Sequence, residues 1–262
     1  MKKFILPVIF VMLTLAAFWL ECFLTKKHYT PLLTSSTTQD NNSNHVEKEL
    51  PLQKYGLNEL AETKVTPGEI TLEEVTTVTD EYLSAIFSFS TSTSEKMTGL
   101  LNLPAGDEAS ISGTVLMLRG YVSPSGYTSG TGTKNAGIYF AKNGFLTFAP
   151  DFLGYGGSDD APADSWQARF EKPLQVKQLL ADLENNDFVC NPTALSNLAT
   201  KNTAKLTEEE SAFLDLCQNR HFAVHSDQLF IWAHSNGGQI ALSTLEIIDE
   251  AIPATLWAPV ST

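Results

Sequence analysis

The sequence is poor in the residues from which most metal sites are built. It contains three cysteines and five histidines in 262 residues. The histidines lie at positions 28, 45, 221, 225 and 234, and although His221 and His225 are four residues apart, the five together do not show the spacing of a metal-binding motif. We therefore expect no metal site.

Basic residues are also scarce. The chain has 17 lysines and arginines against 30 acidic residues, which gives a net charge of −13. A surface of this charge repels phosphate backbones, and no basic stripe along the sequence offsets it. We therefore expect no nucleic-acid partner.

The amino terminus has the composition of a membrane segment. Lys2 and Lys3 precede the uncharged run from Phe4 to Leu20, and the apolar stretch extends to Leu24. This length approaches the ~20 residues of a spanning helix. Residues 1–24 are therefore predicted to be a transmembrane signal-anchor, with a cleaved signal peptide as the alternative. We expect a cytoplasmic amino terminus and a membrane-anchored domain on the extracytoplasmic side.

The next segment, residues 25–66, is rich in serine, threonine and asparagine. It has no sustained apolar period, which is typical of a solvated chain. We predict a flexible linker between the membrane and the domain that follows.

Residues 67–262 alternate between short strands and helices. After an antiparallel start within residues 69–106, buried strands are predicted at Gly113–Gly120, Phe145–Asp151, Ser226–Ala233 and Ala254–Val260. Helices are predicted at Ala136–Gly144, Lys172–Asn185 and Asn236–Ala251. This alternation favours an α/β fold, a mostly parallel sheet with helices on both faces.

One segment, residues 188–225, interrupts the alternation. Asn191-Pro192 and the capping box Thr207 to Glu210 mark two helix starts, so we predict a two-helix insertion near the top of the sheet. This insertion would either shape the access of substrate to the site or have no functional role. Cys190 and Cys217 flank this segment and would pair in an oxidising compartment; the alternative is two unrelated thiols.

The strongest functional signal is FIWAHSNGGQIAL, in which Ser235 stands between an apolar strand and a helix that begins with glycines. A nucleophile elbow needs small neighbours, and Ala233, Gly237 and Gly238 provide them. The alternative is an ordinary strand-to-helix turn with a serine N-cap. The strand, the serine and the double glycine together favour a catalytic Ser235.

From about residue 66 to the end, the chain resembles the α/β-hydrolase superfamily, most closely the prolyl-oligopeptidase and dienelactone-hydrolase type. The resembling segments are TGLLNLPAG, VLMLRGYVSPSGY, FAKNGFLTFAPDFLGYGGSD, LFIWAHSNGG and LWAPVS. The resemblance implies a serine hydrolase that cleaves a small-molecule ester or a peptide without a cofactor. The rival interpretation is a catalytically inactive fragment, or a binding module that retains the fold.

Two loops fit the same resemblance. Arg119-Gly120-Tyr121 stands where these enzymes place the oxyanion loop, so the backbone N–H groups of Tyr121 and Asn236 are the expected oxyanion donors. Arg119 replaces the customary histidine of that loop. The glycine-rich loop from Asp151 to Asp159 is predicted to be a tight turn, because it lacks the spacing and the lysine of a phosphate cradle.

In this fold the serine, the acid and the histidine of the triad follow one another along the chain. Only 27 residues follow Ser235 and none is a histidine; their acids, Glu246, Asp249 and Glu250, belong to the helix that leaves the nucleophile. The resemblance thus implies a sheet that lacks its last strands. We expect the missing acid and histidine within roughly 80–120 further residues, and the 262-residue chain alone to be inactive.

Overall fold

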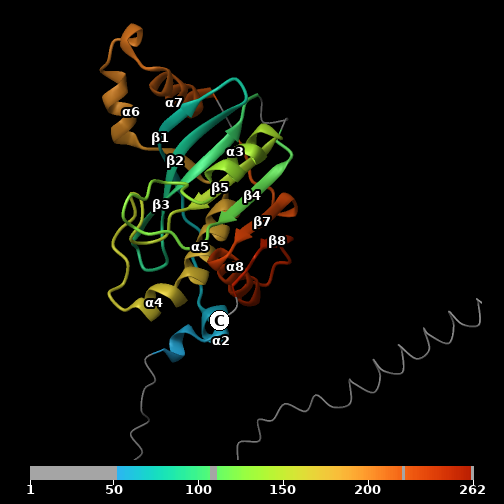
Figure 1. Ribbon diagram of the computed structural model, residues 1–262. Coiled ribbons are helices and arrows are strands. Elements are labelled where there is room, and N and C mark those ends of the chain that lie inside the picture. The colour runs from blue at the N-terminus through green and yellow to red at the C-terminus, as the bar shows by residue number, and fades with distance from the viewer. Residues whose placement is uncertain (1–51, 107–110, 220–221, 261–262) are drawn as a thin grey trace, which may run out of the picture. The chain divides into compact units, whose positions relative to one another are not determined.

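The computed structural model describes residues 52–106, 111–219 and 222–260 (Figure 1). The predicted membrane segment, residues 1–24, and residues 25–51 of the predicted linker lie outside these ranges. Among the residues described, no helix has both the length and the apolar character needed to cross a bilayer.

One sheet carries all the described strands. Its strands are β1 (Ile70–Val78), β2 (Tyr82–Ser90), β3 (Lys96–Pro104), β4 (Gly113–Leu118), β5 (Phe145–Pro150), β6 (Phe188–Cys190), β7 (Leu229–His234) and β8 (Ala254–Trp257). The α-helices are α2 (Leu57–Glu62), α3 (Lys134–Lys142), α4 (Ser165–Phe170), α5 (Lys172–Asn185), α6 (Pro192–Ala199), α7 (Glu208–Asn219) and α8 (Asn236–Ile247). Short 3₁₀ turns occupy Gln53–Tyr55, Thr203–Lys205 and Ser226–Gln228.

The strand order is β6-β1-β2-β3-β5-β4-β7-β8. The pairs β1–β2, β2–β3 and β3–β5 are antiparallel, whereas β1–β6, β4–β5, β4–β7 and β7–β8 are parallel. The sheet is therefore mixed. Its parallel part consists of β5, β4, β7 and β8, and β8 is the edge strand. The three-residue strand β6 was not expected, because it opens the predicted insertion and is too short to give a periodic pattern.

Helices cover both faces of the sheet, as predicted. Strand β4 is buried along its whole length, and its alternate residues face two separate apolar clusters. Leu116 and Leu118 pack in the larger cluster with residues of α5, α7 and α8, whereas Val115 and Met117 pack in a smaller one with residues of α3. Burial on both faces explains why β4 is a continuous apolar run rather than an alternating one.

Residues 52–66 differ from the predicted linker. They include α2, which contacts α8 and buries Leu60. Lys177 on α5 donates hydrogen bonds to the carbonyl oxygens of Ala61 (2.9 Å) and Thr63 (3.0 Å), near the carboxyl end of α2. These contacts join residues more than 110 positions apart in the sequence, so no local composition could indicate them.

The insertion contains the two predicted helices, α6 and α7, with the predicted caps. The Asn191 side chain accepts hydrogen bonds from the Thr193 and Ala194 backbone N–H groups, and Thr207 and Glu210 cap α7 reciprocally. Cys190 and Cys217 form a disulfide with a Cα–Cα distance of 6.0 Å, which ties β6 to α7.

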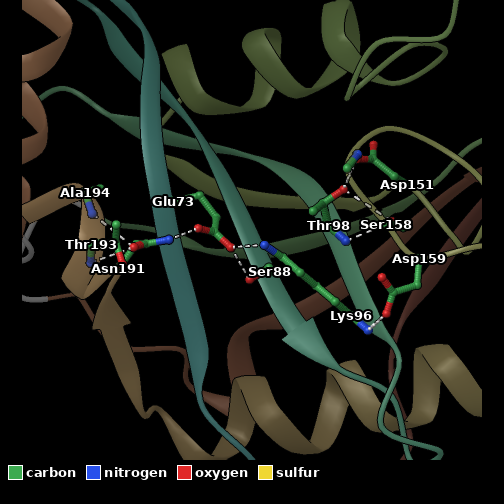
Figure 2. A network of polar contacts seen from close by, with 11 residues as sticks. Glu73, Ser88, Lys96, Thr98, Asp151, Ser158, Asp159, Asn191, Thr193 and Ala194 are labelled. Carbon is green, nitrogen blue, oxygen red and sulfur yellow. Dashed lines mark hydrogen bonds and ion pairs between the residues drawn. The ribbon is translucent and has the colours of Figure 1, made fainter. Parts of the chain in front are cut away.

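The position of the insertion differs from the prediction. Because β6 pairs with β1, the insertion lies at the sheet edge opposite β7 and β8 (Figure 1). Glu73 on β1 connects it to the sheet: its carboxylate accepts hydrogen bonds from Ser88 (2.7 Å) and Asn191, and it pairs with Lys96 (2.6 Å; Figure 2). Four strands separate β1 from β7, so the insertion does not cover Ser235.

Candidate active site

Ser235 occupies the turn between β7 and α8. Its backbone angles are φ 52° and ψ −121°, in a region that residues with a side chain rarely adopt. This conformation allows the chain to pass from a parallel strand into a helix over a single residue. It is the backbone geometry that a nucleophile elbow requires.

The glycines after Ser235 are needed because other backbone lies very close to them. A Cβ atom on Gly237 would lie 2.0 Å from the Leu118 carbonyl oxygen, and one on Gly238 would lie 2.6 Å from the Pro259 Cβ. Ala233, two residues before the serine, is fully buried. The small residues therefore allow α8 to begin directly against the ends of β4 and β8.

Backbone hydrogen bonds hold the turn in place. The Ser235 N–H donates to the Trp257 carbonyl (3.0 Å), and the Ser235 carbonyl accepts from Gly238 (2.9 Å) and Val260 (3.2 Å). The strained residue is thus fixed from both sides by β8 and by the segment after it. Such over-determination is what maintains an unfavourable backbone conformation.

The two expected oxyanion donors flank Ser235. The backbone N–H groups of Asn236 and Tyr121 make no hydrogen bond with any other described residue. Gly120 lies against the serine, since a Cβ atom added to it would be 3.1 Å from the Ser235 Cβ. Tyr121 is 76% exposed, so its side chain does not pack into the loop, which would have been the alternative to an oxyanion role. Acyl transfer needs two such N–H donors, and both of the expected ones are free of other partners among the described residues.

Arg119 holds the loop that carries Tyr121. Its buried guanidinium group donates to the carbonyl oxygens of Gly120 (3.0 Å) and Asp151 (2.8 Å) and lies over the rings of Tyr127 (4.9 Å) and Tyr155 (4.1 Å). In a trans peptide, the C=O and the following N–H point in opposite directions. By binding the Gly120 carbonyl, Arg119 therefore sets the direction of the Tyr121 N–H.

The side chain of Asp151 organises the neighbouring loop. It is fully buried and accepts hydrogen bonds from Thr98 (2.7 Å), Tyr127 (2.8 Å) and Ser129 (2.6 Å); Figure 2 shows the Thr98 contact. Burial, and then the Asp151 charge, raise the pKa of Tyr127 above its usual range, so Tyr127 stays a proton donor. The turn continues through Gly154 and Gly156, which both have positive φ. This arrangement fits the predicted turn.

The histidines do not reach Ser235 within the described structure. The His234 ring packs against Trp257 at 4.7 Å, and His225 precedes β7, at the other end of that strand. His28, His45 and His221 lie outside the described residues. The Ser235 hydroxyl makes no hydrogen bond to any described residue.

The acids after Ser235 lie away from it. Glu246 is near the carboxyl end of α8, and Asp249 and Glu250 follow that end. They line a hollow with residues of α5, and the first of them, Glu246, lies roughly 16–17 Å from the serine along the helix axis by the rise of an α-helix. Within the described ranges, no group of three histidine, cysteine or carboxylate side chains is arranged to hold a metal ion.

A cavity beside the elbow was not indicated by the sequence. It has a volume of about 300 Å³ and is lined by Asn236 and Gln239 of α8, by Arg169 and Lys172, and by residues of the segment 55–60. Burial, and then the positive charges of Arg119 and Arg169, lower the pKa of Lys172 to about 8. No sequence motif marks Lys172, because its environment comes from three separate segments.

Comparisons with known proteins gave structural likenesses only. No family model and no curated protein sequence matches the chain. An acetyl xylan esterase from Thermoanaerobacterium sp. JW/SL YS485 is 16% identical, with a TM-score of 0.43 over 74% of this chain and 53% of that one. The α/β hydrolase GrgF from Penicillium sp. sh18 is 16% identical, with a TM-score of 0.39 over 67% and 46%.

An S-formylglutathione hydrolase from Agrobacterium tumefaciens is 15% identical, with a TM-score of 0.38 over 71% of this chain and 62% of that chain. The chain spans about half the length of the first two of these proteins. Likeness at this level assigns no activity to the chain.

Proposed function

We propose that this protein is a serine hydrolase of the α/β-hydrolase type, which cleaves an ester or peptide bond through an acyl-enzyme on Ser235. The observation that carries the proposal is the backbone of Ser235, at φ 52° and ψ −121° in a strand-to-helix turn. Strain of this kind is maintained where a side chain must be presented in one direction. The prolyl-oligopeptidase-like and esterase specificities are two variants of this proposal.

The proposed chemistry follows from the groups around the serine. The Ser235 oxygen attacks the substrate carbonyl and its proton passes to a general base. The N–H groups of Asn236 and Tyr121 bind the oxyanion, and collapse of the tetrahedral intermediate expels the alcohol or amine. Water then hydrolyses the acyl-enzyme and regenerates the serine. The amino end of α8 adds a partial positive charge beside the developing oxyanion.

The second candidate is a non-catalytic module or inactive fragment that retains the fold. One observation favours it, namely that no described residue accepts a hydrogen bond from the Ser235 hydroxyl. A serine without a base is a weak nucleophile at neutral pH. The two candidates therefore differ in whether Ser235 is activated.

A fluorophosphonate probe separates the two candidates, because it modifies only an activated serine. In a protein in which Ser235 has its general base, we expect one labelled peptide, containing Ser235. Ser235→Ala should abolish labelling and lower ester hydrolysis by at least about 10³-fold, whereas Ser211→Ala, on the exposed surface of α7, should change neither. A protein that resists the probe, or whose turnover survives Ser235→Ala, would favour the non-catalytic module.

We also propose that the domain is membrane-anchored through residues 1–24 and lies outside the cytoplasm. The apolar run from Phe4 to Leu20 supports the anchor, and the Cys190–Cys217 disulfide supports an oxidising compartment. Protein isolated without reductant should yield the linked peptides in mass spectrometry. Two freely alkylated thiols would contradict both the bridge and the extracytoplasmic location.

A further inference from the structure

The cavity beside the elbow shares one wall residue with the proposed catalytic site. Asn236, which follows the nucleophile and offers an oxyanion N–H, is part of its wall. Tyr55 and Leu57 close the cavity from the amino-terminal side, and Gln239 lies one turn further along α8. A group bound here would therefore lie within the reach of a substrate whose carbonyl is at Ser235.

Two cations line this space and a third lies behind it, and none of them has an anionic partner among the described residues. Arg169 and Lys172 line the cavity, and Arg119 lies behind it, since Arg119 and Lys172 are each 5.7 Å from the Phe152 ring. None of the three forms an ion pair within the described chain. The Lys172 ammonium group also makes no hydrogen bond there, and the buried Nε atoms of Arg119 and Arg169 have no acceptor.

The acids nearest in sequence form hydrogen bonds with other groups, and Glu171 does so with a residue of the cavity wall, Tyr55. The Glu171 carboxylate accepts hydrogen bonds from Tyr55 (2.7 Å) and Gln167 (2.7 Å), and Asp164 caps the amino end of α4. Neither carboxylate lines the cavity. Partly buried cations with no counter-ion are costly, and their mutual repulsion adds to the cost. Binding of an anion between them would remove that cost.

We propose that this cavity is the anionic subsite of the substrate, which holds a carboxylate or another oxyanion carried by the ester or amide that Ser235 attacks. The proposal rests on the proposed function for its link to catalysis. Arg169 supplies a planar fork suited to an oxyanion, and it is oriented by its hydrogen bond to Gln239 (2.7 Å). Lys172 supplies a compact second charge. The substrate class is thus a half-ester or acyl compound with a free acid group.

Binding can be tested apart from turnover in the Ser235→Ala protein. Calorimetric titration with monomethyl glutarate and with neutral dimethyl glutarate measures the preference for the anion. We expect the half-ester to bind at least tenfold more tightly. Adding Lys172→Met or Arg169→Gln should reduce this preference to less than twofold, whereas Lys205→Met, at an exposed site on the insertion, should leave it intact.

Equal affinity for the two ligands, or a preference that survives both cavity variants, would overturn the subsite. If Lys172→Met fails to fold by circular dichroism, Arg169→Gln still decides the matter. Displacement of the half-ester by inorganic phosphate would support a general oxyanion site, and its failure, with the preference intact, would support a carboxylate site.

A hydrolysis assay on a protein in which Ser235 has its general base separates this proposal from the proposed function. The substrates are 4-nitrophenyl hydrogen glutarate and neutral 4-nitrophenyl pentanoate. Anion-selective binding without hydrolysis would support the anionic subsite and contradict the proposed hydrolase function. Hydrolysis that depends on Ser235 and proceeds equally fast with both substrates would support the hydrolase function and contradict the anionic subsite.

Discussion

Replacing Lys172 by methionine should stabilise the protein at neutral pH. The lysine ammonium group is partly buried, has no hydrogen bond or ion pair with any described residue, and lies near Arg119 and Arg169. Methionine has a similar length and can pack against the Phe152 ring. The substitution therefore removes an unfavourable charge and leaves the packing largely unchanged.

The magnitude follows from the lowered pKa. The pKa of Lys172 falls from 10.5 to about 8 in the folded protein, and at 1.36 kcal/mol per unit this corresponds to a penalty of about 3 kcal/mol. Loss of the cation–π contact with Phe152 offsets roughly 0.5–1 kcal/mol. We therefore expect Lys172→Met to raise the free energy of unfolding by about 2 kcal/mol at pH 7.

The pH dependence of stability independently tests whether Lys172 destabilises the folded protein. Below pH 8 the lysine is protonated in both states, so the native protein carries the whole penalty. Between about pH 8 and pH 10.5 the unfolded chain keeps a proton that the folded protein has released, so native stability rises with pH. The methionine variant lacks this rise. Its advantage should shrink steadily as the pH approaches 10.5.

Urea denaturation followed by circular dichroism, at pH 7.0 and again near pH 9.5, measures both effects. Lys205→Met, which removes an exposed lysine, is the matched control and should change stability by less than about 0.5 kcal/mol. A loss of stability in Lys172→Met at pH 7, or an advantage that is equally large at the higher pH, would refute the reasoning.

Two further predictions concern Arg119 and the disulfide. Arg119→Met frees the Gly120 carbonyl and with it the direction of the Tyr121 N–H, so kcat for ester hydrolysis should fall about 10–100-fold; a change in KM alone would indicate a binding role instead. Cys217→Ser opens a cross-link of sequence separation 27 and should lower the free energy of unfolding by about 3–4 kcal/mol in urea titrations. An unchanged urea midpoint would show that the bridge does not stabilise the fold.

The parts of the site that the sequence predicted are those that lie close together along the chain. Ser235, Asn236 and the glycines after them occupy one short segment, and each is needed for steric reasons that act over a few residues. The role of Arg119 was not predicted. Its partners, Asp151 and Tyr155, are more than 30 positions away, and the sequence showed only that it stands where a histidine is customary.

The same limit explains the two departures of the fold. The helix α2 is too short to be stable alone and is held by Lys177 and by packing on α8. Strand β6 forms because β1 offers an edge for it. In both cases the stabilising partner is distant in sequence. For this reason the local composition predicts a linker where α2 forms, and an insertion near the site where β6 joins the far edge of the sheet.

The cationic cavity is the part of the site that the sequence could least predict. Its unpaired charges also indicate a function. Its walls come from residues 55–60, from the end of α4, from the start of α5 and from α8, and its charges repel one another. A fold selected for stability alone would separate those charges or pair them with acids, and the chain has 30 acidic residues with which to do so. Arg119, Arg169 and Lys172 form no ion pair among the described residues. Their repulsion therefore lowers the stability of the fold close to the proposed nucleophile. Binding of the anionic group of the proposed substrate would offset this loss of stability.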